Sequence, residues 1–599
     1  MSRRKIMLFS HICYTDHITG AEKLLLFLLG ELKRIHDCIL VVPNEGILSG
    51  EARKIGIDVI VQHYPITEAL WEPQQLTQAK LEQVLVAGYV NPLIDIMHIR
   101  QPDVVVAVTC VNPVPAVAAR RLGISVIWLV TEMLLENEYT NDAVAFMNQH
   151  SDLIVGISHT MLAPYLRYGL SYKTNVLYPA WNGTVRSGTN AVYRKTLRDN
   201  LRLTEGNPLV AFIAADLVPK KGLEHFIFMS TVLSQSLPAA RFLIVGNPTE
   251  RGYYDACMHH VRLSGAAQRF FVAPFTKKIE AVLPAIDVLV MPSLVDEGFG
   301  MTALEGMMFE KAVAAYSSGG LAELLTMTGN GNHLAPKGDA AALARIVGIL
   351  AADTAYRQAV GETSKANATR HFGIAAYRER LADIINRIVQ WANEVKKARE
   401  ALPPLDWPNG IVLMADSNAL FLLEDGKKRP FASEQSLYFF GYGWNRVVVA
   451  DHAILTRFPT GRPVCCESLL PADAPRHMLV AASDGVYVVS EGIRHKIESS
   501  GLLKQIERAA GEALRVPDPY LHIFKEGEPI DDRRFQSGVL IDYELYASAD
   551  GSLYYAERQK LRPVESEQAL YSFLLRYDRI VALAEVEFAS FGLGKPIRL

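Results

Sequence analysis

Short apolar runs alternate with amphipathic segments over about the first 390 residues of the chain. Buried strands are predicted for "KIMLFS", "CILVVP", "DVVVAV", "SVIWLV" and "LIVGIS", with a helix at "AEKLLLFLLGELKRI" between the first two. After "NVLYPAWNG" the alternation begins again, with strands at "LVAFIAA", "RFLIVG", "RFFVA", "DVLVMPS" and "KAVAAYS". Because one doubly wound sheet typically holds about six strands, the two series predict an α/β architecture of two Rossmann-like domains.

The pattern changes near residue 400. A long helical segment over 354–400 is followed by "ALPPLDWPNG", whose three prolines and one glycine predict a linker. Short strands and turns follow, which are typical of a β-rich domain. We therefore predict a first domain over 1–180, a second over 181–400, a linker over 401–408 and a third domain over 409–599.

The third domain contains an internal repeat. "LFLLEDGKKRPFASEQSLYFF" and "LYYAERQKLRPVESEQALYSF" align with Arg429 opposite Arg562, and a fainter copy begins at "VYVVSEGIRHKIESS". The copies end alike in "GRPV", "GEPI" and "GKPI", at Gly461, Gly527 and Gly594. Three copies at this spacing predict a domain of three stacked units. Our hypothesis for its role is acceptor recognition or assembly.

Composition excludes several classes of protein. The chain of 599 residues is 50% hydrophobic and 21% charged, as expected of a globular protein, and its net charge of −3 gives no electrostatic case for nucleic acid as a partner. Six cysteines without a CxxC pair indicate neither a zinc site nor a disulfide framework, so a cytoplasmic location is expected. The chain contains no run of about 18 apolar residues, so we predict no membrane span. Any membrane contact would then be peripheral, at the inner face.

The stretch "DEGFGMTALEGMMFEKAVAAYSSGGLAELL", residues 296–325, combines a candidate site with an unusual density of glycines. The stretch predicts a loop that follows a buried strand and leads into a helix. In parallel sheets, ligands bind at such loops, beyond the carboxyl ends of the strands. The N-terminus of the helix favours an anion such as phosphate. Glu297 in the loop and Glu305 in the first turn of the helix could flank one ligand. A capping box of Thr302 and Glu305 is the structural alternative, but it leaves Glu297 and the Gly319–Gly320 pair unexplained.

The EGFGxxxxE pattern followed by "SSGGLAEL" resembles the signature of family-four retaining glycosyltransferases of the GT-B fold, the EX7E type of glycosyl transferases group 1. "TGAEKLLLFL", "LVPKKGLEHFI", "FLIVGN" and "HFGIAAYRERLADII" are similar to other segments of that family, in the same order. The resemblance covers about residues 1–390. It implies two domains that face a cleft and hold a nucleotide-sugar donor between them.

The resemblance also implies residue roles. Glu297 would face the sugar, Glu305 would accept hydrogen bonds from the ribose hydroxyls, and Lys221 would neutralise the diphosphate. The full set of donor-binding residues that it implies is Gly20, Lys221, Gly246, Asn247, Gly298, Phe299, Gly300, Thr302 and Glu305. A hexosyl group would pass, with retention, to a hydroxyl of a glycan, a lipid-linked carrier or a surface polymer. The chain has no Asp-x-Asp sequence, so we expect neither a metal nor another cofactor.

Two positions depart from the family pattern. Asp216 stands five residues before Lys221, where the family usually has arginine, and Thr131 stands where many members have histidine, which leaves Glu132 as the nearby titratable candidate. Two alternatives therefore stay open: a non-catalytic subunit that binds a sugar or nucleotide sugar, and an enzyme of another type on the same fold, such as an epimerase. The sequence does not indicate an oligomeric state.

Overall fold

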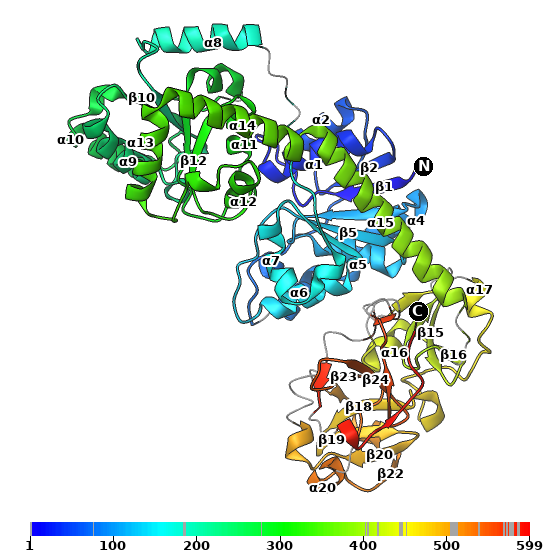
Figure 1. The fold of residues 1–599 in the computed structure, drawn as a ribbon. Coiled ribbons are helices and arrows are strands. Elements are labelled where there is room, and N and C mark those ends of the chain that lie inside the picture. Colours follow the sequence, from blue (N-terminus) through cyan, green and yellow to red (C-terminus); the bar gives the residue numbers. More distant parts are fainter. Residues whose placement is uncertain are drawn as a thin grey trace.

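Three bodies follow one another along the chain: two domains with parallel sheets and a β-rich module (Figure 1). The structure is a computed structural model. The ranges that it describes are 3–75, 77–181, 183, 187–276, 278–401, 403, 406–415, 419–442, 447–450, 452–503, 513–536, 539–566, 569–570, 573, 575, 580–583 and 588–598.

The first domain is built on a seven-stranded parallel sheet in the order β3-β2-β1-β4-β5-β6-β7. Its strands are β1 Lys5–Phe9, β2 Asp37–Val42, β3 Asp58–Val61, β4 Val104–Val108, β5 Ser125–Val130, β6 Leu153–Gly156 and β7 Thr174–Val176. Its helices are α1 Gly20–Leu32, α2 Ile47–Lys54, α3 Thr77–Val84, α4 Ala87–Arg100, α5 Pro113–Arg121, α6 Thr140–Gln149 and α7 His159–Arg167, with 3₁₀ turns at Glu68–Leu70 and Leu170–Lys173. The central strand β4 is buried along its whole length, which explains its unbroken apolar sequence.

The second domain has a six-stranded parallel sheet in the order β10-β9-β8-β11-β12-β13. Its strands are β8 Leu209–Asp216, β9 Arg241–Asn247, β10 Phe270–Ala273, β11 Val288–Met291, β12 Ala312–Tyr316 and β13 Leu334–Ala335. Its helices are α8 Ser187–Asn200, α9 Leu223–Ser236, α10 Arg251–Leu263, α11 Met301–Met308, α12 Gly320–Met327, α13 Ala340–Ala352 and α14 Thr354–Phe372, with 3₁₀ turns that include Pro219–Lys221. The strand order reverses between β8 and β11, where sheets of this kind bind ligands. The prediction of two parallel sheets covered by helices is confirmed.

Helix α15, Ile374–Ala401, leaves the second domain and runs across the first (Figure 1). Tyr377 packs edge-on against Phe27 of α1, and Arg378 pairs with Glu31 at 2.6 Å. The helical segment predicted over 354–400 is present as two helices, because Gly373 adopts an extended backbone that separates α14 from α15. Among the described helices, none is long and apolar enough to cross a bilayer.

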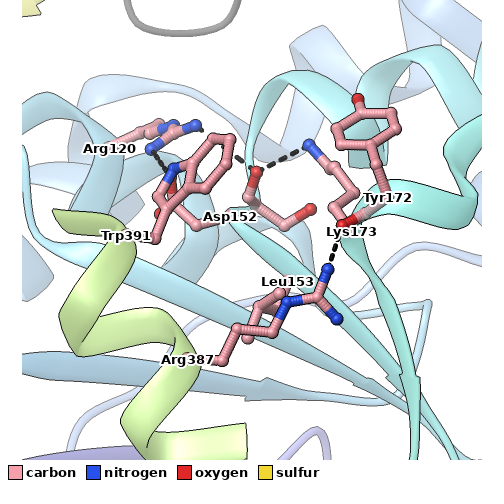
Figure 2. A pocket seen from close by; sticks show the side chains of 8 residues that line it. Arg120, Asp152, Leu153, Tyr172, Lys173, Arg387 and Trp391 are labelled. Atoms are coloured by element: carbon pink, nitrogen blue, oxygen red, sulfur yellow. Dashed lines mark hydrogen bonds and ion pairs between the residues drawn. The ribbon is translucent and has the colours of Figure 1, made fainter. Parts of the chain in front are cut away.

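A small cavity lies beside α15 at the amino end of the first sheet (Figure 2). It is lined by Arg120, Ser151, Asp152, Leu153, Tyr172, Lys173, Arg387 and Trp391. Lys173 donates to the carbonyls of Asn148 and Ser151, Arg120 pairs with Asp152 at 2.8 Å, and Arg387 donates to the carbonyl of Tyr172. Arg387 therefore joins α15 to the first domain, at the end of the sheet opposite to the ligand-binding end, while Lys173 and Arg120 hold together the segments of the first domain that it contacts.

The C-terminal module contains three sheets of similar connectivity. The first has β14 Val412–Met414, β15 Leu420–Glu424, β16 Lys427–Pro430 and β17 Val447–Val449. The second has β18 His477–Ala482, β19 Gly485–Ser490, β20 Ile493–Lys496, β21 Leu514–Arg515 and β22 Lys525–Glu526, and the third has β23 Leu545–Ala547, β24 Leu553–Glu557, β25 Lys560–Pro563, β26 Ile580–Ala582 and β27 Gly592–Leu593. Short helices α16 Glu434–Phe439 and α19 Asp518–Leu521 lie within the first and second units, and α17 His452–Leu455 and α20 Asp532–Gln536 lie between successive sheets. In each sheet three antiparallel strands form a meander, and a further strand pairs in parallel with the first of them.

The repeated sequence anchors are explained by one contact that recurs in each sheet. Arg429, Arg562 and, in the equivalent place, His495 each hydrogen-bond the backbone carbonyl of the residue 33 positions later. The glycine just before that residue lies against the same side chain. A Cβ atom at Gly461, Gly527 or Gly594 would lie 3.0, 2.5 or 2.8 Å from it.

The three units form a closed ring, whereas the sequence predicted a stack. Glu424 of the first unit accepts a hydrogen bond from the backbone of Arg476 at the start of the second. The ring of His477 packs edge-on against Tyr543 of the third unit. Glu557 of the third unit accepts from the side chain of Asn409 at the start of the first, so each unit contacts both others.

The module attaches to the first domain at the amino end of its sheet. Gly123, which precedes β5, has φ +64, and a Cβ there would lie 2.6 Å from Val449. Helix α17 also contacts the end of α15. Thr131 and Glu132 follow β5 at its other end. The module therefore lies at the amino ends of the strands, remote from the candidate site (Figure 1).

We predict that Lys173→Met lowers the unfolding midpoint of the protein. Lys173 is 5% exposed, and its loss removes two hydrogen bonds to the buried carbonyls of Asn148 and Ser151, at a cost of about 1–3 kcal/mol. Thermal unfolding followed by circular dichroism measures the change. The matched control is Lys195→Met, which removes an exposed cation paired with Asp199 within α8 and should leave the midpoint unchanged. Equal midpoints for Lys173→Met and the unaltered protein would contradict the prediction.

Candidate active site

The loop between β11 and α11 is held by the glycines that follow β12. Gly320 N–H donates to the carbonyl of Glu297 at 2.7 Å, and Glu297 and Gly319 form a parallel bridge. A Cβ at Gly319 would lie 2.5 Å from the carbonyl oxygen of Glu297, and one at Gly320 would lie 2.3 Å from that of Gly298. The two glycines therefore allow two loops to touch backbone to backbone, which explains their place in the sequence.

Lys221 and Glu297, 76 positions apart in the sequence, meet at the strand-order switch. Lys221 Nζ lies 2.7 Å from Glu297 Oε1, and the hydroxyl of Ser293 donates to the same oxygen at 2.7 Å. Gly222 follows Lys221 with φ +77, and a Cβ there would lie 2.0 Å from the carbonyl oxygen of Pro292. The sequence predicted the lysine and the glutamate as site residues, whereas Ser293 was missed.

Glu305 lies in the second turn of α11, where the sequence predicted the first. The helix begins at Met301 after Gly300, whose φ of +104 favours glycine, and no side chain caps it. The alternative of a Thr302–Glu305 capping box is therefore wrong. Burial raises the pKa of Glu305 to about 7. The positive charge of Lys23, near the start of α1, lowers this pKa and so reduces the effect of burial. The interaction with Lys23 links the two domains electrostatically.

The EGFG loop also contacts the first domain. A Cβ at Gly298 would lie 3.1 Å from the Ile157 side chain and 3.3 Å from the carbonyl oxygen of Thr131. The Phe299 ring is 3% exposed and packs against the rings of Tyr178 and Phe372, with centroids 6.1 and 5.2 Å away. The side chain of Phe299 thus anchors the loop where the chain crosses between the domains, and its backbone remains the part that could meet a ligand.

Glu323 of α12 forms a second link between the domains. Its carboxylate accepts hydrogen bonds from the backbone N–H of His159 at 3.0 Å, from that of Thr160 at 3.4 Å and from the Tyr178 hydroxyl. The positive end of helix α7 favours a carboxylate in this position. Sequence reasoning assigned Glu323 no role, although it lies three residues after the glycine pair.

Glu132 and Thr131 lie at the carboxyl end of β5. Glu132 Oε1 accepts from Cys110 N–H at 2.5 Å, and Oε2 accepts from the backbone and the hydroxyl of Thr131. The carboxylate thereby ties the ends of β4 and β5 together. Thr109, just after β4, has φ +71, a strained conformation for a β-branched residue.

His11, just after β1, is a titratable group on this side that sequence reasoning missed. Burial lowers its pKa to about 4, so its imidazole is neutral at pH 7. Its Nδ1 atom is buried and has no hydrogen-bond partner within the described ranges. Only its position directly after a predicted strand could have identified it from sequence.

The remaining predicted residues surround this edge of the two sheets. Gly20 is the first residue of α1 with open space around it, and Gly246 lies against Leu217. Asn247 Oδ1 accepts from Phe275 N–H at 3.3 Å, and Asp216 is exposed at the end of β8. Within the part of the chain that the structure describes, no group of three or more His, Cys, Asp or Glu side chains could hold a metal ion.

Comparison with known proteins places the family match in the second domain. The model of the family "Glycosyl transferases group 1" matches residues 194–367, which include Lys221, Glu297 and Glu305. Over 145 residues the chain is 34% identical to 2-deoxystreptamine glucosyltransferase of Streptomyces kanamyceticus, a match that covers 24% of this chain and 36% of that protein. The chain thus spans about a third of the length of this curated relative.

Solved structures are similar over a longer part of the chain. HepE of Anabaena, in complex with UDP and glucose, has 19% sequence identity and a TM-score of 0.50, and covers 64% of this chain and 100% of its own. A glycosyltransferase from Rickettsia africae has 14% identity and a TM-score of 0.55, and covers 65% of this chain and 99% of its own. Together with the two parallel sheets, these likenesses show that the chain has the GT-B fold, followed by additional β-rich sheets.

Proposed function

We propose that this protein is a glycosyltransferase that moves a sugar from a nucleotide-sugar donor to a hydroxyl group. The observation that carries the proposal is the meeting of Lys221 and Glu297 at the strand-order switch of a domain that matches glycosyl transferases group 1. The similar HepE structure is a complex with UDP and glucose, which supports a nucleotide sugar as the donor here.

The reaction requires stabilisation of a departing nucleoside diphosphate. Lys221 supplies a positive charge, and the N-terminus of α11, from Gly300 to Thr302, supplies backbone N–H groups that no side chain caps. In our proposal these groups need no metal ion to assist them. Glu297 lies against the sugar, and the acceptor hydroxyl attacks on the face from which the diphosphate leaves, with retention of configuration.

The first domain supplies the acceptor side in this proposal. We propose a glycan, a lipid-linked carrier or a surface polymer as the acceptor and a cytoplasmic location, with contact at the inner face of the membrane as the route to a lipid-linked acceptor. The β-rich module lies on the far edge of the first domain, so assembly with a partner fits its position better than direct contact with the reacting hydroxyl.

Asp216 favours a second candidate, a subunit that binds nucleotide sugars without turnover. This exposed carboxylate ends β8, five residues before Lys221, where the family usually has arginine. A lost charge-assisted hydrogen bond to the diphosphate is worth about 1.5–3 kcal/mol. Release of nucleoside diphosphate from the donor, with or without an acceptor, distinguishes the enzyme from the binding subunit.

We predict that one nucleoside diphosphate and its sugars stabilise the full chain against heat. A ligand at 100 times its Kd adds about 2.7 kcal/mol, because it binds only the folded state. Thermal unfolding in the presence of UDP, GDP, ADP and their sugars measures this shift. An unchanged midpoint with every compound would argue against a nucleotide-sugar donor and hence against the proposed function.

We predict that the affinity for this nucleotide falls as the pH decreases through 7. Burial raises the pKa of Glu305 to about 7, so the carboxyl is mostly protonated at pH 6, and only the deprotonated carboxylate can accept hydrogen bonds from both ribose hydroxyls with its two oxygens. The Kd at pH 6 should therefore be about tenfold higher than at pH 8, as titration calorimetry measures.

The matched control is Glu305→Gln, which cannot titrate and should retain only the pH dependence of the nucleotide's own phosphate. Identical pH profiles for this variant and the unaltered protein would show that Glu305 does not bind the ligand as a carboxylate.

A further inference from the structure

Two hydrogen bonds converge on one oxygen of the Glu297 carboxylate. The Lys221 ammonium and the Ser293 hydroxyl each donate to Oε1 at 2.7 Å. The other oxygen, Oε2, takes part in neither bond. The lysine assigned to the diphosphate is therefore itself engaged by a carboxylate of the same site.

This ion pair reduces what Lys221 can offer to an anion. The Lys221 side chain is 34% exposed and that of Glu297 is 16% exposed, so water screens the pair only in part. While the ammonium lies 2.7 Å from Glu297 Oε1, the carboxylate balances much of its positive charge, and less of that charge acts on a diphosphate. The interaction between Lys221 and Glu297 must weaken before the ammonium can neutralise a diphosphate fully.

Of the two partners, Lys221 is the one that can move. The backbone of Glu297 is bridged to Gly319, and its carbonyl accepts from Gly320 N–H. Ser293 is 2% exposed and holds the carboxylate through Oε1 from the start of the same loop. The lysine has a flexible four-carbon stem and three donors, so it can leave Oε1 while the serine hydroxyl remains.

We propose that Glu297 and a nucleoside diphosphate compete for Lys221. The ammonium passes to the diphosphate when the donor binds and returns to Glu297 when the diphosphate leaves, while Ser293 keeps the carboxylate in place. The return of Lys221 to Glu297 lowers the affinity for the spent diphosphate and favours its release. This inference rests on the proposed function and adds to it a role for the ion pair in product release.

A double-mutant cycle on the full chain tests the competition. Titration calorimetry with UDP, GDP and ADP is carried out on the unaltered protein, Glu297→Gln, Lys221→Met and the double variant. The glutamine keeps the size of the side chain and an acceptor for Ser293 but loses the charge that holds Lys221. We expect Glu297→Gln to tighten binding of the responding nucleotide about five- to tenfold when Lys221 is present, and less than about twofold in the Lys221→Met background.

Ser293→Ala is the matched control, because it removes the other hydrogen bond to Oε1 and leaves the charge of Glu297 unchanged. It should not tighten nucleotide binding. An equal gain from Ser293→Ala and Glu297→Gln would trace the effect to a loosened loop and overturn the proposal.

The other outcomes are equally distinct. An equal gain from Glu297→Gln with and without Lys221 would mean direct repulsion of the diphosphate, and no gain would mean that Lys221 serves both partners at once. Either result overturns the competition and leaves the proposed function standing. If neither the unaltered protein nor Glu297→Gln binds any of the three nucleotides, the proposed function fails as well.

Discussion

The backbone contact between Glu297 and the Gly319–Gly320 pair is the constraint on which the site depends. It requires residues without a Cβ atom on the β12 side, and it fixes the loop after β11 at hydrogen-bonding distance from its neighbour. With the loop fixed, the Glu297 side chain reaches Lys221 at the switch between β8 and β11. The density of glycines in this part of the sequence thus follows from the need for two loops to approach closely.

The same segment also joins the two domains. Gly298 lies against the carbonyl of Thr131, Phe299 inserts its ring beside Tyr178, and Glu323 accepts hydrogen bonds from the start of α7. Residues that could hold a donor and residues that hold the domains together are therefore consecutive in the chain. A change in the relative position of the domains would act on the Glu297 loop directly, because no intervening element separates the two sets of contacts.

The two parallel sheets could be predicted from sequence because buried parallel strands are apolar along their whole length. The candidate site could be proposed because the loop motif follows such a strand. Glu323 could not be assigned a role, since its partners come from a distant segment: His159 lies 164 positions before it. Ser293 lies only four positions before its partner Glu297, but the two meet through the conformation of an irregular loop, which no periodic pattern predicts. The capping box of Thr302 and Glu305 failed because Gly300, in a left-handed conformation, is the N-cap of α11, so Thr302 lies inside the helix. The break at Gly373 depends on tertiary contacts that no local pattern records.

The closed ring of the C-terminal module brings its two ends together. Asp406, at its start, pairs with Lys595 near its end, and its carbonyl accepts a hydrogen bond from Arg562. A domain whose ends are adjacent can be inserted into a loop of another protein or moved to another chain without distortion of the host. The adjacent ends of the module are thus compatible with insertion into a surface loop as well as with its position after α15.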